Sequence, residues 1–335
     1  MNSKNINLTR FYLLFLFGFL FVLIFTIILP HEVSSRYYEI GEDGKKAGWI
    51  YDRIHRDDKN IDIAFLGSSH TMMGIDSEAI DRSLSLVEEK APTSVNFGMP
   101  YAGDNLPYIL TKRLLGQRSV KLLVIEVRET PARIPNPMFR YLADTGDILL
   151  PVWVINVNAL SDIAFLPRRQ IALFFQTLRK VWWPSSTGLG NQNYEGSYWF
   201  KEAKTNIHDT AEIREMKRTM EAEKIGAIFP QNLKWIELNF SHEYISRTVT
   251  LANTMGVQIK FLYLPSFDAP HRPVDEKFLA GLGTIWIPPS NLLDEASNWD
   301  DAAHLNRKGA SELAEWLVTK ISSEMGDTFR SPRKS

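Results

Sequence analysis

Apolar residues are distributed along this chain in one long uninterrupted run, in several short runs, and at every third or fourth position of longer stretches. The long run, residues 11–29, carries no charge and ends at Pro30. It is long enough to cross a hydrocarbon core of roughly 30 Å as a helix. Lys4 and Arg10 precede it without an acidic residue. The positive-inside rule therefore predicts a cytoplasmic N-terminus, with everything from about residue 31 onward outside the membrane.

A cleaved signal peptide is the alternative interpretation of this run. The run is long for a signal peptide, and residues 33–35 (Val-Ser-Ser) form a poor small-x-small cleavage site. We therefore expect residues 1–35 to be a cytoplasmic tail and an uncleaved single-pass anchor in a bacterial cytoplasmic membrane. Residues 36–325 are then an extracytoplasmic domain, and residues 326–335 are expected to be a flexible tail.

The short apolar runs predict strands of a buried sheet, because strands covered on both faces are almost continuously apolar. Stretches between them have helical spacing, such as residues 105–115, where Gly116 is the expected stop. Strands that alternate with helices predict a parallel sheet. We therefore expect an α/β fold, a flavodoxin-like doubly wound parallel sheet of about five strands. The expected strands cover residues 61–66, 95–98, 121–127, 257–264 and 284–287.

The alternating pattern is interrupted between residues 128 and 235, which we interpret as a large insertion. It contains a run with apolar stretches at 159–181 and a highly charged helical run at 210–224, for which a solvated helix face is the favoured interpretation. The insertion is suited to be a lid or substrate wall, because indole faces stack on sugar rings; a packed hydrophobic subdomain is the alternative. Its tryptophans are Trp153, Trp182, Trp183 and Trp199.

Composition excludes several classes of function. Hydrophobic residues make up 44% and charged residues 23% of the chain, which are values of a globular protein. The net charge of -1 gives no indication of a nucleic-acid partner. The chain has no cysteine, so disulfides and thiolate catalysis are excluded. No phosphate-cradling glycine loop is visible, so we expect no nucleotide cofactor. We also expect no metal, because the remaining histidines show no ligand spacing: His31, His55, His208, His242 and His271.

Two short motifs far apart in the sequence supply the groups of a nucleophilic serine site. Ser69 follows the first expected strand, and Asp301 and His304 lie just before the last expected helix. Each motif alone has an ordinary explanation, since Gly-Ser-Ser is a common turn and Asp301 can cap a helix. In a doubly wound sheet, however, both positions fall at the carboxyl ends of the strands, where ligands bind. We therefore predict that Ser69, His304 and Asp301 form a catalytic triad.

These motifs resemble those of the SGNH hydrolase superfamily, the GDSL-like esterases and acyltransferases. Residues 67–69 match the first block, with serine in place of the usual acidic middle residue, and residues 301–306 match the last block. Residues 96–104 resemble the second block, whose glycine N–H helps bind the oxyanion. The resemblance covers residues from about 60 to 130 and from 235 to 325. It implies an oxyanion hole made by the N–H groups of Ser69 and Gly103, with Gly98 in reserve; loops that need positive φ are the other explanation for these two glycines.

The third block of the family normally supplies an asparagine to the oxyanion, and residues 126–130 contain none. A missing donor of this kind costs on the order of a hundredfold to a thousandfold in turnover. Arg128 is a candidate substitute, and an exposed structural arginine is the alternative. His70 and Asn105 are further candidate substrate contacts, although His70 is favoured as a turn histidine that satisfies backbone groups.

The layout of the chain is similar to that of membrane-anchored relatives such as the alginate-acetylation proteins and the teichoic-acid D-alanylation protein. The resemblance implies serine-dependent acyl transfer, in first place O-acetylation of a cell-envelope or secreted polysaccharide, without a cofactor. The expected partners are an acyl donor, a polysaccharide acceptor and a multi-spanning membrane protein that delivers acyl groups. Two alternatives stay open: a carboxylesterase or deacetylase with the same triad, and a non-catalytic envelope-assembly protein that kept the fold.

Overall fold

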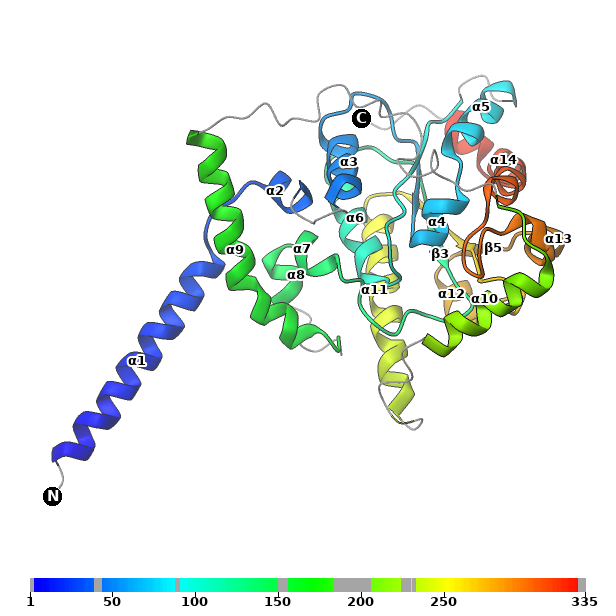
Figure 1. Cartoon of the computed structure of the whole chain (residues 1–335). Coiled ribbons are helices and arrows are strands. Elements are labelled where there is room, and N and C mark those ends of the chain that lie inside the picture. Colours follow the sequence, from blue (N-terminus) through cyan, green and yellow to red (C-terminus); the bar gives the residue numbers. More distant parts are fainter. Residues whose placement is uncertain are drawn as a thin grey trace.

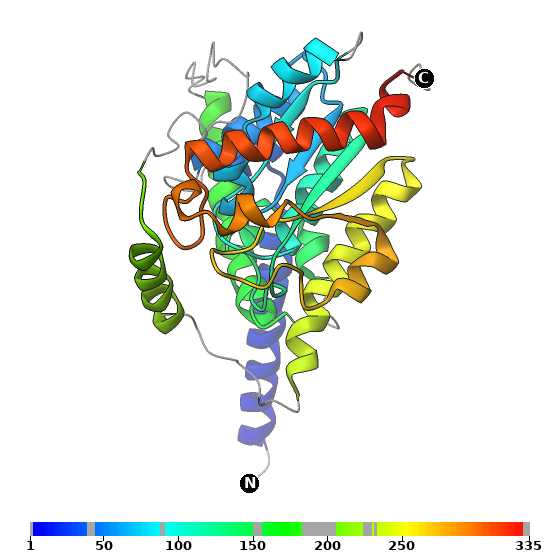
Figure 2. The ribbon, with the colours of Figure 1, turned by 90° about the vertical axis from the view of Figure 1, so that its right-hand side faces the viewer.

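A parallel sheet organises the protein and confirms the expected doubly wound α/β fold. The computed structural model describes residues 3–38, 44–87, 91–149, 156–182, 206–223, 230 and 233–330. In these residues five parallel strands are paired in the order β2-β1-β3-β4-β5 (Figures 1 and 2). The strands are β1 (Ile63–Leu66), β2 (Ser94–Asn96), β3 (Leu122–Val127), β4 (Gln258–Tyr263) and β5 (Thr284–Trp286).

The strand order reverses direction at β1. Phe65 of β1 pairs with Asn96 of β2 on one side and with Val124 of β3 on the other. In an open parallel sheet the two connections that leave such a strand pair go to opposite sides, which opens a crevice at the carboxyl ends of the strands. The loop that follows β1 is therefore placed where such folds bind their ligands.

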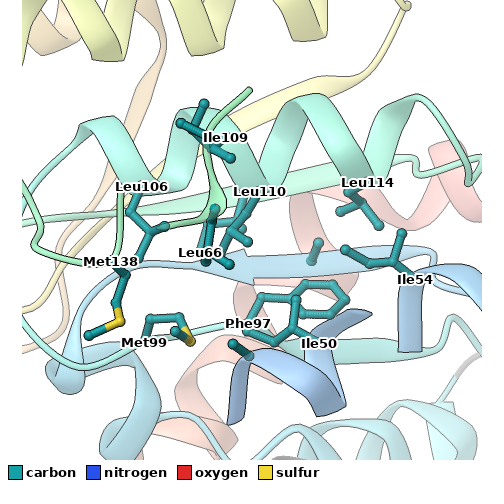
Figure 3. Close-up of a cluster of buried hydrophobic side chains, with 14 of the residues drawn as sticks. Ile50, Ile54, Leu66, Phe97, Met99, Leu106, Ile109, Leu110, Leu114 and Met138 are labelled. Carbon is teal, nitrogen blue, oxygen red and sulfur yellow. The ribbon is translucent and has the colours of Figure 1, made fainter. Parts of the chain in front are cut away.

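One face of the sheet is covered by α3 (Gly44–His55), α6 (Asn105–Leu115) and α11 (Lys234–Thr254). Leu66 of β1 lies against α6, and the apolar side of that helix faces the strand (Figure 3). Helical spacing produces this contact, because residues three and four apart share one face. The residues of α6 on this side are Leu106, Leu110 and Leu114, and Ile109 belongs to the same buried cluster.

The opposite face is covered by α5 (Ser77–Val87), α13 (Ser290–Asp294) and α14 (Arg307–Arg330). Ile63 and Phe65 point to this face, whereas the neighbours of Phe65 in β1 point to the other, as alternation in a strand requires. A smaller cluster joins the ends of β3 and β4 to α12 (Glu276–Leu282). All four residues of β1 are buried, which explains the continuous apolar run in the sequence.

The helix predicted at residues 105–115 is α6, and it ends at Gly116 as expected. Gly256 follows α11 with a φ of 68°, a left-handed conformation that favours glycine. The first strand begins at Ile63 rather than at residue 61. Short helices without a full amphipathic period were not predicted: α2 (Val33–Tyr38), α4 (Ser69–Gly74), α7 (Phe139–Leu142) and α8 (Thr145–Leu149).

The described parts of residues 128–235 pack on both faces of the sheet. α7, α8 and α9 (Ala159–Trp182) contribute to the core under α3 and α6. On the other face α10 (Thr210–Glu223) buries Ile213 completely, so only part of this charged helix is solvated. Lys217 of α10 donates to the carbonyls of Phe267 and Asp268. Trp182 is 71% exposed, and Trp153, Trp183 and Trp199 lie outside the described residues.

The N-terminal helix α1 (Ser3–Ile27) projects from the rest of the protein (Figure 1). Residues 8–27 have a mean hydropathy of 2.3 and their side chains are largely exposed. By length and composition this helix is compatible with a single-pass membrane anchor. At the other end α14 continues to Arg330 and buries Phe329, beyond the expected end of the domain at residue 325, while residues 331–335 lie outside the described residues.

Candidate active site

The structure brings together the three residues predicted as a triad, although 235 positions separate Ser69 from His304. The Oγ atom of Ser69 lies 2.8 Å from Nε2 of His304. Nδ1 of the same ring lies 2.9 Å from Oδ2 of Asp301. This is the arrangement of a nucleophile, a general base and a carboxylate that orients the base.

Ser69 is the first residue of α4 and directly follows the loop that leaves β1. Ser68 caps this helix, since its Oγ accepts a hydrogen bond from the amide of His70. The buried carboxylate of Glu126, near the end of β3, accepts hydrogen bonds from the amide and hydroxyl of Ser68 at 2.8 and 2.5 Å. It also accepts from the amide and hydroxyl of Thr71 at 2.9 and 2.6 Å. These four bonds fix the first turn of α4, and with it the direction of the Ser69 side chain.

Asn96, the last residue of β2, holds the other end of α4. Its Nδ2 donates to the carbonyls of Thr71 at 2.9 Å, Met72 at 3.3 Å and Ile75 at 2.9 Å. A helix end has carbonyls without intrahelical partners, and this amide satisfies them. The nucleophile therefore stands on a short helix held by side chains from the two strands that flank β1.

The loop of Asp301 positions the general base. Oδ1 of Asp301 accepts hydrogen bonds from the amides of Ala303 at 2.7 Å and His304 at 2.8 Å. The carboxylate therefore shapes the turn that carries the imidazole as well as contacting its Nδ1. Burial acts to raise the pKa of Asp301, but the hydrogen bond and charge of His304, together with the two amides, hold that pKa below its ordinary value.

Two of the three expected oxyanion donors are available. Among the described residues, the amides of Ser69 and Gly103 have no hydrogen-bond partner. The amide of Gly98 donates instead to Oδ1 of Asn96 at 2.9 Å, so it is already used. Both glycines sit in crowded places: a Cβ on Gly98 would lie 2.5 Å from the amide nitrogen of Met72.

The loop of Gly103 is shaped by Asn136, a residue within the region interpreted as an insertion. Nδ2 of Asn136 donates to the carbonyls of Pro100 at 3.0 Å and Tyr101 at 2.9 Å. Gly103 has a φ of 137°, and a Cβ there would lie 2.2 Å from the amide nitrogen of Asn136. Tyr101 also has a positive φ, 67°, which is uncommon outside glycine and is typical of functional loops. Only glycine fits at position 103.

A small cavity of about 40 Å³ lies beside Gly67 and Ser68, immediately before the candidate nucleophile. Gly103 and Arg128 are part of its wall, together with Asp104. Burial raises the pKa of Asp104 to about 6, against the smaller lowering effect of the hydrogen bond that it accepts from the hydroxyl of Ser241. A site for one water needs about 10–15 Å³ by the same measure, so only a few non-hydrogen atoms fit.

The three residues predicted as substrate contacts occupy different surroundings. His70 is 5% exposed, and its ring centroid lies 5.5 Å from that of His304. Burial, with the charges of Arg128 and His304, lowers the pKa of His70 well below its ordinary value, while hydrogen bonds with the Leu264–Pro265 backbone act in the opposite direction. This is the placement of a histidine that satisfies backbone groups.

Asn105 is fully buried, and its Oδ1 accepts a hydrogen bond from the amide of Asn136 at 2.9 Å. Within the described part of the chain its Nδ2 has no partner. Arg128 lies in the cavity wall and is only partly exposed, with Nη2 3.4 Å from Oγ of Ser266 and 3.8 Å from the carboxylate of Glu129. The Arg128 guanidinium thus places a positive charge in the cavity wall, two residues after Glu126.

The sequence analysis did not predict the positioning roles of Glu126 and Asn136, although the sequence contains a signal for each. Glu126 is a charged residue inside an otherwise apolar strand run, and a charge in that position is buried only when it is hydrogen-bonded. Asn136 lies between two prolines, a composition typical of a rigid turn.

In the described ranges, no group of three or more His, Asp or Glu side chains is placed to hold a metal ion. Comparison with protein-family models gives no match, and comparison with curated proteins gives none either.

Proposed function

We propose that this protein is a serine-dependent acyltransferase of the SGNH type, which O-acetylates a cell-envelope or secreted polysaccharide. The observation that carries the proposal is the 2.8 Å contact between Ser69 Oγ and His304 Nε2, with Asp301 on the other ring nitrogen. Such a contact activates a hydroxyl that is otherwise a weak nucleophile. The motifs around Ser69 and His304 that resemble the SGNH blocks support the same chemistry.

In the first step Ser69 Oγ attacks the carbonyl carbon of an acyl donor, and its proton passes to Nε2 of His304. The carboxylate of Asp301 accepts a hydrogen bond from Nδ1–H and stabilises the imidazolium. The tetrahedral intermediate collapses when the bond to the leaving group breaks, and that group takes the proton from His304. Acyl-Ser69 remains.

In the second step a sugar hydroxyl gives its proton to Nε2 of His304 and attacks the acyl carbon. The bond to Ser69 Oγ breaks, and Oγ recovers the proton from His304. Water in place of the sugar gives hydrolysis, so transfer requires that the acceptor be held in place and water be excluded. The segment 128–235, which the sequence suggests as a substrate wall, is our candidate for this role.

The amides of Ser69 and Gly103 are the proposed oxyanion donors, and their lack of other partners among the described residues supports this assignment. Arg128 takes the part of the missing asparagine by placing a positive charge in the cavity wall. A guanidinium stabilises a developing oxyanion by charge, whereas an amide does so by a dipole. The cavity beside Ser68 has room for the methyl group of an acetyl but not for a long acyl chain, which favours a short acyl group.

The decisive experiment is intact mass spectrometry of the full chain after incubation with p-nitrophenyl acetate. We expect one acetyl group on Ser69 in the wild type and none in Ser69→Ala. Ser85→Ala, which changes an exposed serine on α5, is the matched control and keeps the adduct. A wild-type protein that never forms the adduct overturns the catalytic proposal and favours the non-catalytic alternative.

A second measurement separates transfer from hydrolysis. The acetyl-enzyme is mixed with acetate-free buffer or with an oligosaccharide, and the products are acetylated sugar or free acetate. Faster loss of the adduct with sugar, together with acetylated product, supports the transferase. Equal loss in both mixtures supports the carboxylesterase or deacetylase.

The proposed location is the outer side of a bacterial cytoplasmic membrane, with α1 as the anchor and a multi-spanning membrane protein as the acyl source. The two basic residues before the apolar run, Lys4 and Arg10, support this orientation. Because the natural chain lacks cysteine, single cysteines at Asn5 and Lys308 report the topology by labelling of intact cells with an impermeant maleimide. After removal of any outer membrane, labelling at 308 and protection at 5 is the expected result; the reverse contradicts the orientation.

A further inference from the structure

A second cavity, of about 260 Å³, shares no lining residue with the cavity beside Ser68 and is rich in arginine. It is formed where α7 and α9 meet α2, close to the end of α1. Its volume is close to the lower end of ligand pockets, about 300 Å³. Three guanidinium groups and two aromatic rings line it, namely those of Arg36, Arg168, Arg169, Tyr141 and Phe165.

The positive charge in this cavity is only partly neutralised. Arg36 forms a salt bridge with Asp144 at 2.6 Å. Among the described residues, no carboxylate pairs with Arg168 or Arg169. Arg169 is 4% exposed and donates from Nη1 to the carbonyls of Arg140 and Ala143, yet within the described part of the chain its Nε and Nη2 atoms have no partner.

A buried guanidinium edge without an acceptor is costly, because each unpaired donor keeps its full desolvation penalty. Burial, and then the charge of Arg36, lower the pKa of Arg169 to about 10. An anion in the cavity would lie beside these guanidinium groups and relieve the repulsion between their charges. Phosphate fits this geometry well, since arginine binds it through two parallel N–H groups.

The cavity lies next to the exit of the apolar helix α1. Nε2 of Gln170, in α9, donates to the carbonyl of Ile27 at 2.8 Å. Thr177 accepts from the amide of Glu32 at 3.2 Å, and Lys180 forms a salt bridge with the carboxylate of Glu32 at 3.2 Å. These contacts hold α9 across the end of α1, and Figures 1 and 2 both show the two helices side by side there.

The side of α9 that faces away from the sheet is apolar and exposed. Its residues recur at spacings of four and seven, so they form one stripe along the helix. Exposed apolar residues on a helix with basic neighbours are typical of helices that lie in a membrane interface. The stripe contains Leu160, Ala164, Ile171, Phe175 and Trp182, and the basic neighbours are Arg168 and Arg179.

We propose that α9 lies in the surface of the bilayer that α1 enters, with its apolar stripe in the lipid, and that the cavity of Arg36, Arg168 and Arg169 holds the phosphate of an anionic phospholipid. The stripe lies on a helix that contacts the end of α1, and the cationic cavity complements an anionic headgroup. This inference rests on the proposed role of α1 as an uncleaved anchor, and it is independent of the chemistry at Ser69.

The first test measures phospholipid binding to the full chain in neutral detergent by native mass spectrometry. The probes are dioleoylphosphatidylglycerol, dioleoylphosphatidylcholine and inorganic phosphate. We expect dioleoylphosphatidylglycerol to bind. We expect Arg168→Gln to weaken its binding roughly tenfold, the effect of losing one charge-assisted hydrogen bond. Arg82→Gln, which changes an exposed arginine on α5 outside the cavity, is the control and is expected to bind as the wild type does.

Equal losses of lipid affinity in the two arginine variants would show that binding depends only on general surface charge, which overturns the proposed site. Equal binding of the choline lipid would overturn the choice of an anionic lipid. Tight binding of inorganic phosphate that displaces the lipid would make free phosphate the ligand. Acetylation of Ser69 is measured in the same samples, so a failed acyltransferase proposal is recognised separately.

The second test places a nitroxide on single cysteines in nanodiscs that contain phosphatidylglycerol. A label at Phe175→Cys is expected to collide with oxygen, which concentrates in lipid, and to be shielded from a nickel complex that stays in the water. Leu86→Cys, equally apolar and exposed on α5 at the far side of the molecule, keeps that contact (Figure 1). A label at Phe17→Cys reports on α1 itself. Full nickel contact at position 175, with position 17 protected, overturns the proposal for α9 and leaves the anchor intact.

Discussion

The carboxylate of Glu126 is bound to both the amide and the hydroxyl of Ser68, the residue before the candidate nucleophile. Glu126 is 6% exposed, and two further donors of Thr71 complete its shell. A buried carboxylate is stable only with such a set of donors. The position of the serine is therefore set from β3 as well as from its own strand.

Glu126→Gln is expected to displace the first turn of α4, because an amide offers only one acceptor oxygen to these donors. We expect a loss of about 1–3 kcal/mol in the free energy of unfolding and slower acetylation of Ser69 in the folded protein. Urea unfolding and the burst of p-nitrophenol measure the two effects. Glu243→Gln, which changes a carboxylate of α11 that pairs with Arg247 instead, is the control. Equal effects of both changes would refute a special role for Glu126.

Asp301→Asn keeps the acceptor oxygen for the amides of Ala303 and His304 but loses the charge. With its oxygen on these two amides, the side chain presents its N–H₂ to Nδ1, so the ring proton moves to Nε2 and the imidazole can no longer accept the serine proton. By analogy with triads in general, we expect turnover to fall roughly 10,000-fold with the fold intact. Steady-state hydrolysis of p-nitrophenyl acetate measures it. Asp300→Asn, the adjacent buried aspartate, should leave turnover within a small factor of wild type.

Gly103→Ala puts a methyl group 2.2 Å from the Asn136 amide nitrogen in a conformation that only glycine adopts easily. The loop must move, so we expect a loss of about 1–3 kcal/mol in stability and of most acetylation at Ser69. Gly146→Ala in α8 meets no atom within 4 Å and is the control, with stability unchanged or slightly raised. Thermal unfolding measures the change in stability, and the rate of Ser69 acetylation measures the effect on the site. An active Gly103→Ala protein would remove this amide from the oxyanion hole.

Asp104→Asn tests the buried carboxyl of the cavity. The pKa of Asp104 is raised from 3.8 to about 6, so the folded state binds its proton more tightly than the unfolded state. Stability from this group is therefore complete below about pH 4 and is lost as the pH rises to about 6. The variant removes that decline and is expected to be more stable at pH 7, on the order of 1–3 kcal/mol. Urea unfolding from pH 4 to 7 measures it, with Asp58→Asn at an exposed position as control. An unchanged pH profile contradicts the raised pKa.

The elements that could be predicted are those whose burial shows in their own sequence. β1 and β3 are apolar on both faces, and α6 has a complete apolar side ended by Gly116. The positions of Ser69 and His304 followed from the same logic, since the carboxyl ends of parallel strands lie at one edge of the sheet. The distance of 2.8 Å between Ser69 Oγ and His304 Nε2 could be known only from the structure.

What escaped prediction depends on contacts between distant segments. Asn136 shapes the loop of Gly103 from a region without regular periodicity, and no local pattern links the two. The role of Glu126 depends on donors that lie 55 and 58 positions earlier. α10 was favoured as solvated because charges dominate it, but Ile213 is fully buried, and Met216 and Met220, three and seven positions later, pack against the same core. Hydrophobic periodicity carries no information about the hydrogen bonds of Asn136 and Glu126.

The short helix that begins with Ser69 is hydrogen-bonded to Glu126 of β3 at its N-terminal end and to Asn96 of β2 toward its C-terminal end. The hydroxyl of Ser69 is thus held in place by side chains of the central sheet. An acyltransferase of the kind proposed above could therefore change the surfaces around its substrate while the serine kept its position.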